Sequence, residues 1–431
     1  MEDWLDLNPD PVHVKREREK ARALRATDWW RAQLARGECH YCHGKFKASE
    51  LTMDHVVPVA RGGRSTRGNC VPCCRDCNAK KKAYTPAERI LDSLFAGIAA
   101  VALCVAVPLQ ALASVPPLSV ESAGMLAEEA LGRGMSGLTW LGGSRYVAVC
   151  DCDGSARILD IDVDGCDGSP RSCAVVGTVR LEGCLDLEGC AYDAPNGTLW
   201  ASDEKTAAIA EFDLATGRRL RAAPVPEVIA KSRLSNYNLE ALSISPDALS
   251  MWTANEEALK CDGPRASAET GTTVRIVRFT RPDPKSEWSV SGMWAYTTER
   301  LAEPNNPTTA NRCGVAGMCA LPGGTLLVLE RELSGFTFRF RLYAADFEGA
   351  DDVSAAPSLG GAAFRPVGKT LLASYAKRYS IMRPNAELGN FEGICLGPEL
   401  QDGSRALVLI ADAGDMITRP LVKTLRLRGG R

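Results

Sequence analysis

The sequence predicts a multidomain protein in which a small zinc-stapled domain and an all-β propeller of five or six blades are joined by an apolar helix. Three observations support this prediction. Two Cys-x-x-Cys pairs lie near the N-terminus, an uncharged apolar segment follows them, and a hairpin pattern then repeats along the chain. We therefore divide the 431 residues into a zinc domain at 1–93, an apolar segment at 94–115 and a propeller at 116–431.

Charge and cysteine are distributed unevenly along the chain. Residues 1–93 contain 18 Lys and Arg against 13 Asp and Glu, a net charge of +5, whereas the remainder carries −7. A basic small domain suits an anionic partner, and an acidic larger one suits solubility or cation binding. Ten of the 17 cysteines follow the apolar segment, which indicates an oxidising compartment. Their spacing does not fix how they pair; we favour Cys166 with Cys173 and Cys261 with Cys313, because each pair would close a loop.

The two Cys-x-x-Cys pairs have the spacing of a zinc site. They supply Cys39 and Cys42, and then, after 31 intervening residues, Cys74 and Cys77. Four thiolates fill the tetrahedral positions of Zn²⁺ and leave none for water, so the predicted ion is structural. A domain this small buries little core and needs such a staple.

Between and beside these pairs stand residues suited to phosphodiester chemistry. The segment holds Asp54-His55 and Asn69, and Asn78 follows the last cysteine. Histidine has a pKa near neutrality and serves as a general base. A carboxylate beside an amide oxygen suits a hard cation, Mg²⁺ or Mn²⁺, which neutralises charge on the phosphate.

The order of these residues resembles the HNH endonuclease family, whose pattern of CxxC, DHxxPxxxGG, Asn and CxxCN is present across residues 39–81. The resemblance implies the ββα-metal fold, a hairpin and helix around a metal, with DNA as the partner. It implies that His55 is the general base and that Asn69 fixes the loop and orients the histidine. It also implies that Asp54 and Asn78 bind the catalytic ion. The alternative is a zinc module that binds DNA without cutting it.

The apolar segment 94–115 fits a signal peptide or a transmembrane helix. It holds no charged residue, it reaches the length of about 20 residues that a membrane span needs, and small residues surround Ala113 at its end. Basic residues precede it: Lys80, Lys81, Lys82 and Arg89. We expect either a membrane anchor with a cytoplasmic N-terminus and an exported propeller, or a propeller secreted after cleavage near Ala113. A buried core helix is the third alternative.

Residues 116–431 contain a repeated hairpin. Its copies open at matched positions, the first three of them 52 residues apart: Ser136, Glu188, Glu240, Ala316 and Glu392. Each opening leads through a turn and an apolar strand to an acidic or amide residue, as short propeller strands do. The two later intervals are longer, so a sixth blade or large insertions are candidates at 258–312 and 336–390.

Matched positions of successive blades meet around the central channel of a propeller. Glu188, Glu240 and Glu392 are therefore predicted to converge on one mouth, where gathered carboxylates need a cation such as Ca²⁺. Arg331 and Lys205, each beside a glutamate, are candidates for holding a phosphate. The alternative is that each glutamate caps the backbone of its own blade.

The phrases DLEGCAYD, NLEALSISPD and NFEGICLGP, with NGTLWASDE and MWTANE, resemble the esterase-like phytase family of secreted β-propellers over residues 130–420. The resemblance implies hydrolysis of phosphate or carboxyl esters with Ca²⁺. No histidine follows His55, so a Ser-His-Asp arrangement is excluded from the propeller. The alternatives are a ligand-binding propeller without catalysis, and an artificial fusion of two adjacent genes.

Overall fold

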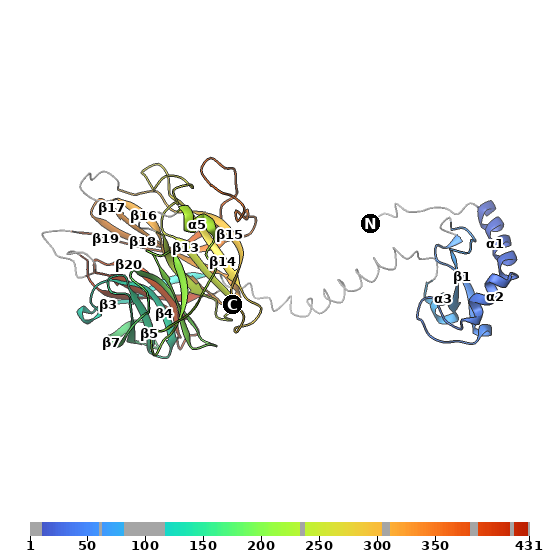
Figure 1. Cartoon of the computed structure of the whole chain (residues 1–431), viewed down its shortest axis with the longest axis horizontal. Helices are drawn as coiled ribbons and strands as arrows, with labels where there is room; N and C mark the ends of the chain where they lie inside the picture. Colours follow the sequence, from blue (N-terminus) through green and yellow to red (C-terminus); the bar gives the residue numbers. More distant parts are fainter. Residues whose placement is uncertain are drawn as a thin grey trace. The chain divides into compact units, whose positions relative to one another are not determined.

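The computed structural model describes residues 11–59, 63–81, 117–232, 238–303, 311–379, 387–413 and 418–429. The chain forms two compact units, Met1–Ala113 and Ser114–Arg431 (Figure 1). The predicted apolar helix at 94–115 lies outside the described residues. Within those residues, no helix is both long and apolar enough to cross a membrane.

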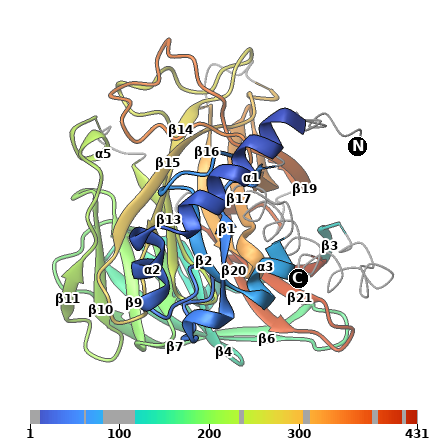
Figure 2. The ribbon, with the colours of Figure 1, turned by 90° about the vertical axis from the view of Figure 1, so that its right-hand side faces the viewer.

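The smaller unit is built on a two-stranded hairpin followed by a helix (Figure 2). Its elements are α1 (Pro11–Arg25), α2 (Asp28–Ala35), the 3₁₀ turn η1 (Ala48–Glu50), β1 (Leu51–His55), β2 (Cys70–Cys74) and α3 (Arg75–Lys81). The strands are antiparallel, with Leu51 opposite Cys74 and His55 opposite Cys70. Helix α3 follows β2 directly and contacts both strands. The predicted ββα arrangement is confirmed.

This unit has a small core. Helix α2 begins at Thr27, whose hydroxyl accepts from the Trp30 amide at 3.4 Å and so caps the first turn. The buried cluster under the hairpin contains only Leu51 and three cysteines, with a few half-buried side chains around it. So little buried apolar surface does not stabilise a fold by itself, and domains of this size commonly add a metal or disulfide staple.

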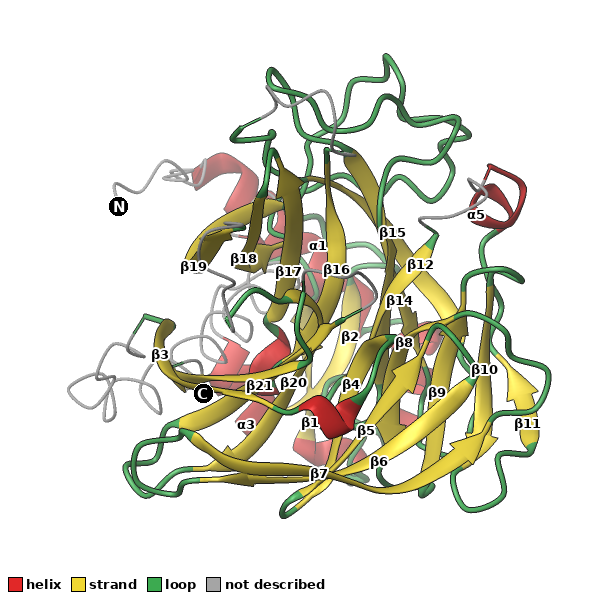
Figure 3. Ribbon diagram, turned by 90° about the vertical axis from the view of Figure 1, so that its left-hand side faces the viewer, coloured by secondary structure: helices red, strands yellow, loops and turns green. Residues whose placement is uncertain are grey.

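The larger unit consists of five four-stranded antiparallel sheets, drawn almost entirely as strands and loops in Figure 3. The first blade is β4 (Met135–Gly142), β5 (Arg145–Cys150), β6 (Ser155–Val163) and β7 (Pro170–Arg180). The second is β8 (Leu187–Asp193), β9 (Thr198–Asp203), β10 (Ala208–Asp213) and β11 (Arg219–Ala222). The third is β12 (Leu239–Ile244), β13 (Ser250–Asn255), β14 (Thr273–Thr280) and β15 (Ser289–Thr297).

The remaining blades differ in how they are completed. The fourth is β16 (Arg312–Ala320), β17 (Leu326–Ser334), β18 (Thr337–Asp346) and β19 (Gly368–Arg378). The fifth is β20 (Asn390–Glu399), β21 (Arg405–Asp412), β22 (Leu421–Arg428) and β3 (Ser119–Ala127). Strand β3 comes first in this unit and pairs with β22, so the two ends of the propeller chain share one blade. Short helical segments lie between strands: η3 (Glu129–Leu131), α5 (Glu227–Ser232) and η4 (Pro322–Gly324).

The blades close into a ring. Strands β4, β8, β12, β16 and β20 are the innermost strands, and each contacts the next, with β20 returning to β4. Matched glycines let these strands approach one another. A Cβ added to Gly189 would lie 2.6 Å from the Glu240 carbonyl, and one added to Gly393 would lie 2.5 Å from the Ser136 carbonyl. Four of the five opening residues are followed by such a glycine, and the third blade has Ala241 there, so close packing requires glycine at four places in the ring.

Five apolar clusters hold the ring together, one at each junction between adjacent blades. At the junction of the second and third blades, Trp200 packs with Phe279 and Trp288. A bidentate ion pair reinforces the same junction: both Arg281 Nη atoms lie 2.8 Å from the carboxylate of Asp193, with no exposed surface on either side chain. Each blade therefore packs against both of its neighbours through one of these clusters.

The sequence predicts five or six blades, and the structure confirms this prediction, with five blades. Residues 258–312 and 336–390 were candidates for a sixth blade. In the described parts of these segments lie the outer strands of the third and fourth blades and their loops. The repeated unit found in the sequence is the inner hairpin of each blade, such as β8 with β9.

The favoured disulfides are wrong. All sixteen cysteines of the described residues are free thiols. The Cys166 thiol is exposed and lies 3.2 Å from the Gln401 side-chain oxygen, whereas Cys173 is buried between the first and fifth blades. Cys313 is fully buried on β16. The cysteines of the propeller are core and surface residues of its strands and loops.

Candidate functional site

The four cysteines predicted to bind zinc lie together. The sulfur atoms of Cys39, Cys42, Cys74 and Cys77 are all within 4.8 Å of one another. Cys74 ends β2 and Cys77 lies in the first turn of α3, so the strand-to-helix junction sets their separation. Such a set of four thiolates fits a closed, structural Zn²⁺ site.

Backbone amides donate hydrogen bonds to two of these sulfurs. The Cys74 amide donates to the Cys39 sulfur and the Cys77 amide to the Cys74 sulfur, both at 3.4 Å. Burial opposes ionisation of Cys39, but the amides of Cys74, Cys42 and Tyr41 outweigh it and lower its pKa to about 6. By contrast, burial raises the pKa of the neighbouring Cys73 to about 12. Cys73 stays a thiol outside the cluster, as the spacing predicts.

Asp54 and His55, the predicted ion ligand and general base, are the last two residues of β1. The Tyr41 hydroxyl donates to Asp54 at 2.6 Å, and the Asn78 amide donates to the Thr52 hydroxyl at 3.2 Å. Thr52 and Asp54 are two residues apart on β1, so their side chains lie on the same face of the strand. The hydrogen bond to Thr52 therefore brings Asn78, on α3, to the face that carries Asp54. Their role as ligands of a catalytic ion remains a prediction.

Asn69 fixes the loop between the two strands. Its side-chain oxygen accepts from the Val57 amide at 2.8 Å, and its side-chain nitrogen donates to the carbonyls of Val57 and Arg64 at 3.0 and 2.9 Å. These three bonds tie both ends of the loop that follows His55. The role of Asn69 in orienting His55 remains a prediction.

His55 contacts a residue that the sequence did not single out. Its Nε2 lies 2.8 Å from the hydroxyl of Ser65, which is buried. Ser65 in turn contacts Glu17 of α1 through its hydroxyl and its backbone amide. Hydrogen bonds from Lys20 and from the Ser65 amide lower the pKa of Glu17 to about 2, so this buried acid is a carboxylate. In the sequence, Glu17 is marked only as an acidic residue within a predominantly basic helix.

A second candidate site lies inside the propeller. A cavity of about 240 Å³ opens where the innermost strands begin and the second strands end. Its walls are almost entirely polar: Asp151, Asp186, Glu188, Glu204, Glu240, Arg312, Arg331, Asn390, Glu392 and Asp412. The three glutamates at matched positions therefore meet at one mouth.

Side chains of all five blades meet in this cavity. The Ser136 hydroxyl lies 2.9 Å from Glu188 and 3.1 Å from Glu392, and so joins them. The buried guanidinium of Arg331 donates to both Glu392 and Glu256. Glu240 lines the same cavity and is buried. Glu188 and Glu392 therefore bind side chains of other blades, which contradicts, for these two, the alternative that each caps its own blade.

Residues at the end of the second strand of a blade, instead, accept hydrogen bonds from backbone amides. Asp203 accepts from the Leu185 amide at 2.8 Å, and Asp412 accepts from the Gly134 amide at 2.8 Å. Asn255 accepts from the Arg275 amide at 2.9 Å. These residues hold the loops that form the cavity walls.

Burial controls the protonation of the cavity. It raises the pKa of Glu188 to about 8 and that of Glu240 well above its usual value. Burial also opposes the charge on Glu256, but the neighbouring Arg331 outweighs it and lowers the pKa. Burial and the nearby Asp412 raise the pKa of Asp151 to about 6. Without a further cation, protons and Arg331 therefore offset part of the acidic charge.

The group best placed to hold a cation differs from the predicted one. Asp186, Glu188 and Glu204 present oxygen atoms within 4.8 Å of one another. Glu188 belongs to both groups, whereas Glu240 and Glu392 contact Arg331 or its partners. Lys205 lies 3.2 Å from Asp186, so its ammonium reaches the same carboxylates from the rim. Arg331 is inside the cavity and Lys205 beside it.

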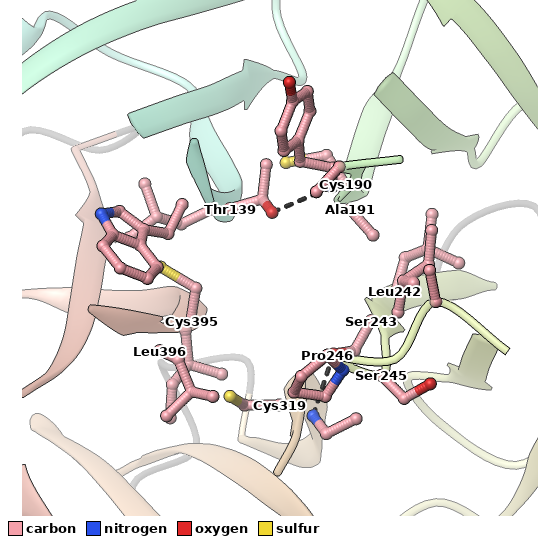
Figure 4. A pocket seen from close by; sticks show the side chains of 18 of the residues that line it. Thr139, Cys190, Ala191, Leu242, Ser243, Ser245, Pro246, Cys319, Cys395 and Leu396 are labelled. Carbon is pink, nitrogen blue, oxygen red and sulfur yellow. Dashed lines mark hydrogen bonds between the residues drawn. The ribbon is translucent and has the colours of Figure 1, made fainter. Parts of the chain in front are cut away.

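The other end of the channel has a different chemistry. A cavity of about 270 Å³ lies where the innermost strands end, and mainly apolar side chains and thiols line it (Figure 4). Of the four hydroxyl-bearing residues that line it, two accept from backbone amides of adjacent blades: Thr139 from Tyr192 at 3.0 Å and Ser243 from Ala320 at 2.9 Å. These two join blades. Arg405 is the one charged residue of this lining, whereas the carboxyl groups line the cavity at the other end of the channel.

Two family models match the chain, one in each unit. An HNH endonuclease family model matches residues 39–83. A phytase-like family model, described as the esterase-like activity of phytase, matches residues 132–413. No curated protein sequence matches the chain.

Several solved structures resemble the propeller at low identity. Hydrazine synthase of Kuenenia stuttgartiensis is 12% identical over 71% of this chain and 65% of its own, with a TM-score of 0.32. Glutaminyl cyclase of Myxococcus xanthus is 10% identical over 73% of this chain and 98% of its own, with a TM-score of 0.33. A gluconolactonase of Xanthomonas campestris is 14% identical over 75% of this chain and 93% of its own, with a TM-score of 0.31.

The two family models match separate parts of the chain, as the sequence predicts. The HNH match contains the four-cysteine cluster and His55. The phytase-like match spans more than half of the chain and contains the ring of innermost strands with its carboxylate cavity. The chain is therefore a two-module protein that carries an HNH region and belongs, through its propeller, to the phytase-like family.

Proposed function

We propose that the smaller unit is a metal-dependent DNA endonuclease. The observation that supports this best is the placement of His55, which ends β1 beside a loop fixed by Asn69 and a staple of four cysteines. His55 acts as the general base and takes a proton from the attacking water. Asp54 and Asn78 hold a divalent ion, Mg²⁺ or Mn²⁺, which neutralises the developing charge on the phosphate. The thiolate-bound zinc keeps the frame folded.

The surface of α1 supports a polyanionic partner. Glu17 and Ala21 turn inward, while basic side chains on the remaining faces are exposed: Lys15, Arg16, Arg18, Lys20 and Arg22. Neutralisation of phosphates by such residues gives sequence-independent affinity that falls as salt rises. DNA held along α1 would lie beside the loop that α1 contacts through Glu17.

Cleavage of supercoiled plasmid tests this function. We expect the full chain to convert supercoiled DNA to nicked or linear product when Mg²⁺ or Mn²⁺ is present, and chelator to stop the reaction. Cleavage should weaken with rising salt, because the phosphate contacts release counterions. A protein that shifts DNA in a gel yet cuts none with Mg²⁺, Mn²⁺ or Ni²⁺ would establish the alternative, a zinc module that only binds.

For the propeller we propose a hydrolase that acts on phosphate or carboxyl esters at the carboxylate cavity. The supporting observation is the pairing of buried carboxyl groups with Arg331 in one cavity. Without histidine in this unit, proton transfer falls to the carboxyl groups of the cavity. Arg331 offers a guanidinium for a phosphate, and Lys205 offers a second cation at the rim.

A bound Ca²⁺ would complete this site. Carboxylate oxygens are the ligands that Ca²⁺ prefers, and Asp186, Glu188 and Glu204 are spaced to share one ion. When bound, the ion would offset the gathered acidic charge and attract an anionic ester. The rival hypothesis is a ligand-binding propeller in which Arg331 and protons alone neutralise the cavity.

Melting curves separate these hypotheses. A cation that binds only the folded state stabilises it by about 2.7 kcal/mol at a hundredfold excess over its dissociation constant. We therefore expect Ca²⁺ to raise the melting temperature of the propeller. Glu188→Gln, Glu240→Gln and Glu392→Gln should each reduce that rise, Glu188→Gln most, because it removes a member of the group spaced for an ion.

The exposed Glu348→Gln is the matched control for this series and should leave the Ca²⁺ response unchanged. Identical melting curves in chelator and in millimolar Ca²⁺, together with no turnover of nitrophenyl phosphate or nitrophenyl acetate, would support the rival binding propeller.

We also propose that the propeller is exported, either anchored through 94–115 or released by cleavage near Ala113. The support is the basic flank before this uncharged segment and the small residues at its end. The size and N-terminus of the mature protein test it. A product that begins near Ser114 would separate the propeller from the nuclease, and an intact product in the cytoplasm would refute export. Two separate transcripts would instead show an artificial fusion of adjacent genes.

A further inference from the structure

The proton on the imidazole of His55 can be located from its neighbours. Nε2 of His55 and Oγ of Ser65 are 2.8 Å apart, so one of them donates to the other. A serine hydroxyl has a single hydrogen, whereas a neutral imidazole carries its proton on either nitrogen. The direction of this bond therefore depends on where the Ser65 hydrogen points.

A second contact of Ser65 determines where its hydroxyl hydrogen points. Oγ of Ser65 also lies 2.6 Å from the backbone carbonyl oxygen of Glu17, and a carbonyl oxygen only accepts. Ser65 must then donate to Glu17, and its oxygen must accept from His55. In neutral His55 the proton consequently lies on Nε2, and the basic lone pair lies on Nδ1.

Helix α1 holds Ser65 in this orientation. The Ser65 amide donates to the carboxylate of Glu17 at 2.7 Å, so one residue of α1 engages both polar groups of Ser65. Lys20 binds the other carboxylate oxygen at 2.8 Å, and only 1% of the Glu17 side chain is exposed. His13, one turn earlier on α1, contacts the Gly63 carbonyl of the same loop at 3.1 Å. Two residues of α1, through three hydrogen bonds, therefore orient the loop.

We infer that Ser65 and Glu17 are positioning residues of the nuclease, which fix the tautomer of His55 so that Nδ1 is its basic nitrogen. This inference rests on the proposed function of His55, yet it makes a claim about the imidazole that holds without any substrate. A base in the wrong tautomer presents a hydrogen where the attacking water needs a lone pair. The hydroxyl of Ser65 prevents that state by accepting from Nε2.

Nitrogen-15 resonance of the histidines tests the tautomer directly. The full chain has only four histidines, so selective labelling of the zinc-loaded protein gives few signals, and a His55→Gln variant assigns the one of interest. At about pH 8.5 an ordinary imidazole is neutral. We expect two-bond correlations that place the proton of His55 on Nε2. A proton on Nδ1 in the wild-type protein would overturn the inference without any need for a variant.

Variants then connect the tautomer to cleavage. Ser65→Ala should leave His55 with a mixture of tautomers and lower kcat roughly 10- to 100-fold with KM for DNA unchanged, as expected when a supporting hydrogen bond to a functional histidine is lost. Ser65→Thr keeps the hydroxyl and should restore both readouts. Thr66→Ala, which removes an exposed hydroxyl one residue along, is the matched control.

The two claims fail in different ways. If wild-type protein has the Nε2 proton but cuts no DNA, the nuclease function is wrong while the assigned tautomer stands. If DNA is cut and Ser65→Ala changes neither the tautomer nor kcat, the role of Ser65 is wrong while the nuclease function stands.

Discussion

Replacing His55 by alanine is expected to abolish cleavage of DNA while the protein keeps its zinc and its affinity for DNA. A positioned general base contributes roughly a hundred- to ten-thousand-fold to rate, and alanine offers no group to take the proton of the attacking water. His55 ends β1 and is not part of the four-cysteine cluster, so its loss leaves the staple intact. Plasmid cleavage, gel shift and metal content, measured on the same preparation, check the three parts of this expectation.

A second histidine of the same unit provides the control. His43 is exposed and hydrogen bonds to Glu38 at 3.0 Å, away from β1. His43→Ala should cut DNA as the wild type does. Wild-type cleavage by His55→Ala would show that the nuclease activity came from a contaminant or from another residue, and it would remove the main support for the proposed function.

Replacing Cys74 by serine is expected to unfold the smaller unit and leave the propeller folded. Structural zinc contributes on the order of 10 kcal/mol of apparent binding free energy, which exceeds the stability of a typical small domain. The buried cluster under the hairpin is too small to replace that contribution. Cys74 also begins the connection into α3, so loss of its thiolate frees both β2 and the helix.

Metal analysis and amide hydrogen exchange of the full chain measure this effect. We expect one zinc per wild-type chain and none in Cys74→Ser, with protection lost in β1, β2 and α3 but kept in the propeller strands. Cys73→Ala is the matched control: it removes a buried thiol outside the cluster and should keep the ion. Wild-type protein purified without zinc would contradict the prediction outright.

Local patterns explain most of what the sequence predicts correctly. The four thiolates are set by two short motifs, each of which needs only a tight turn to bring its sulfurs together. The inner hairpins, such as β12 with β13, carry their own turn and apolar strand within about 15 residues, so their repetition is visible in the sequence. The number of blades is less visible, because the outer strands β14 and β18 follow segments of unequal length.

Contacts between distant residues explain what the sequence did not reveal. Arg331 was marked only by its neighbour Glu330, yet the fold places its guanidinium between Glu256 and Glu392, which belong to two other blades. Ser65 and Glu17 are 48 residues apart, and neither belongs to a motif. The carboxylates spaced for a cation come from the ends of strands, and strand ends cannot be located in sequence to a single residue.

The pairing of β3 with β22 also bears on how the propeller is made. Ser122 and Lys423, which meet across this pair at 3.0 Å, are 301 residues apart in the chain. During synthesis β3 leaves the ribosome first and then waits, with its backbone groups unpaired, until the last strand of the unit has followed. Ring closure therefore comes after translation of the whole unit, and contacts so distant form slowly. A growing chain in this state keeps an open strand edge that can pair with another chain until the last strand arrives.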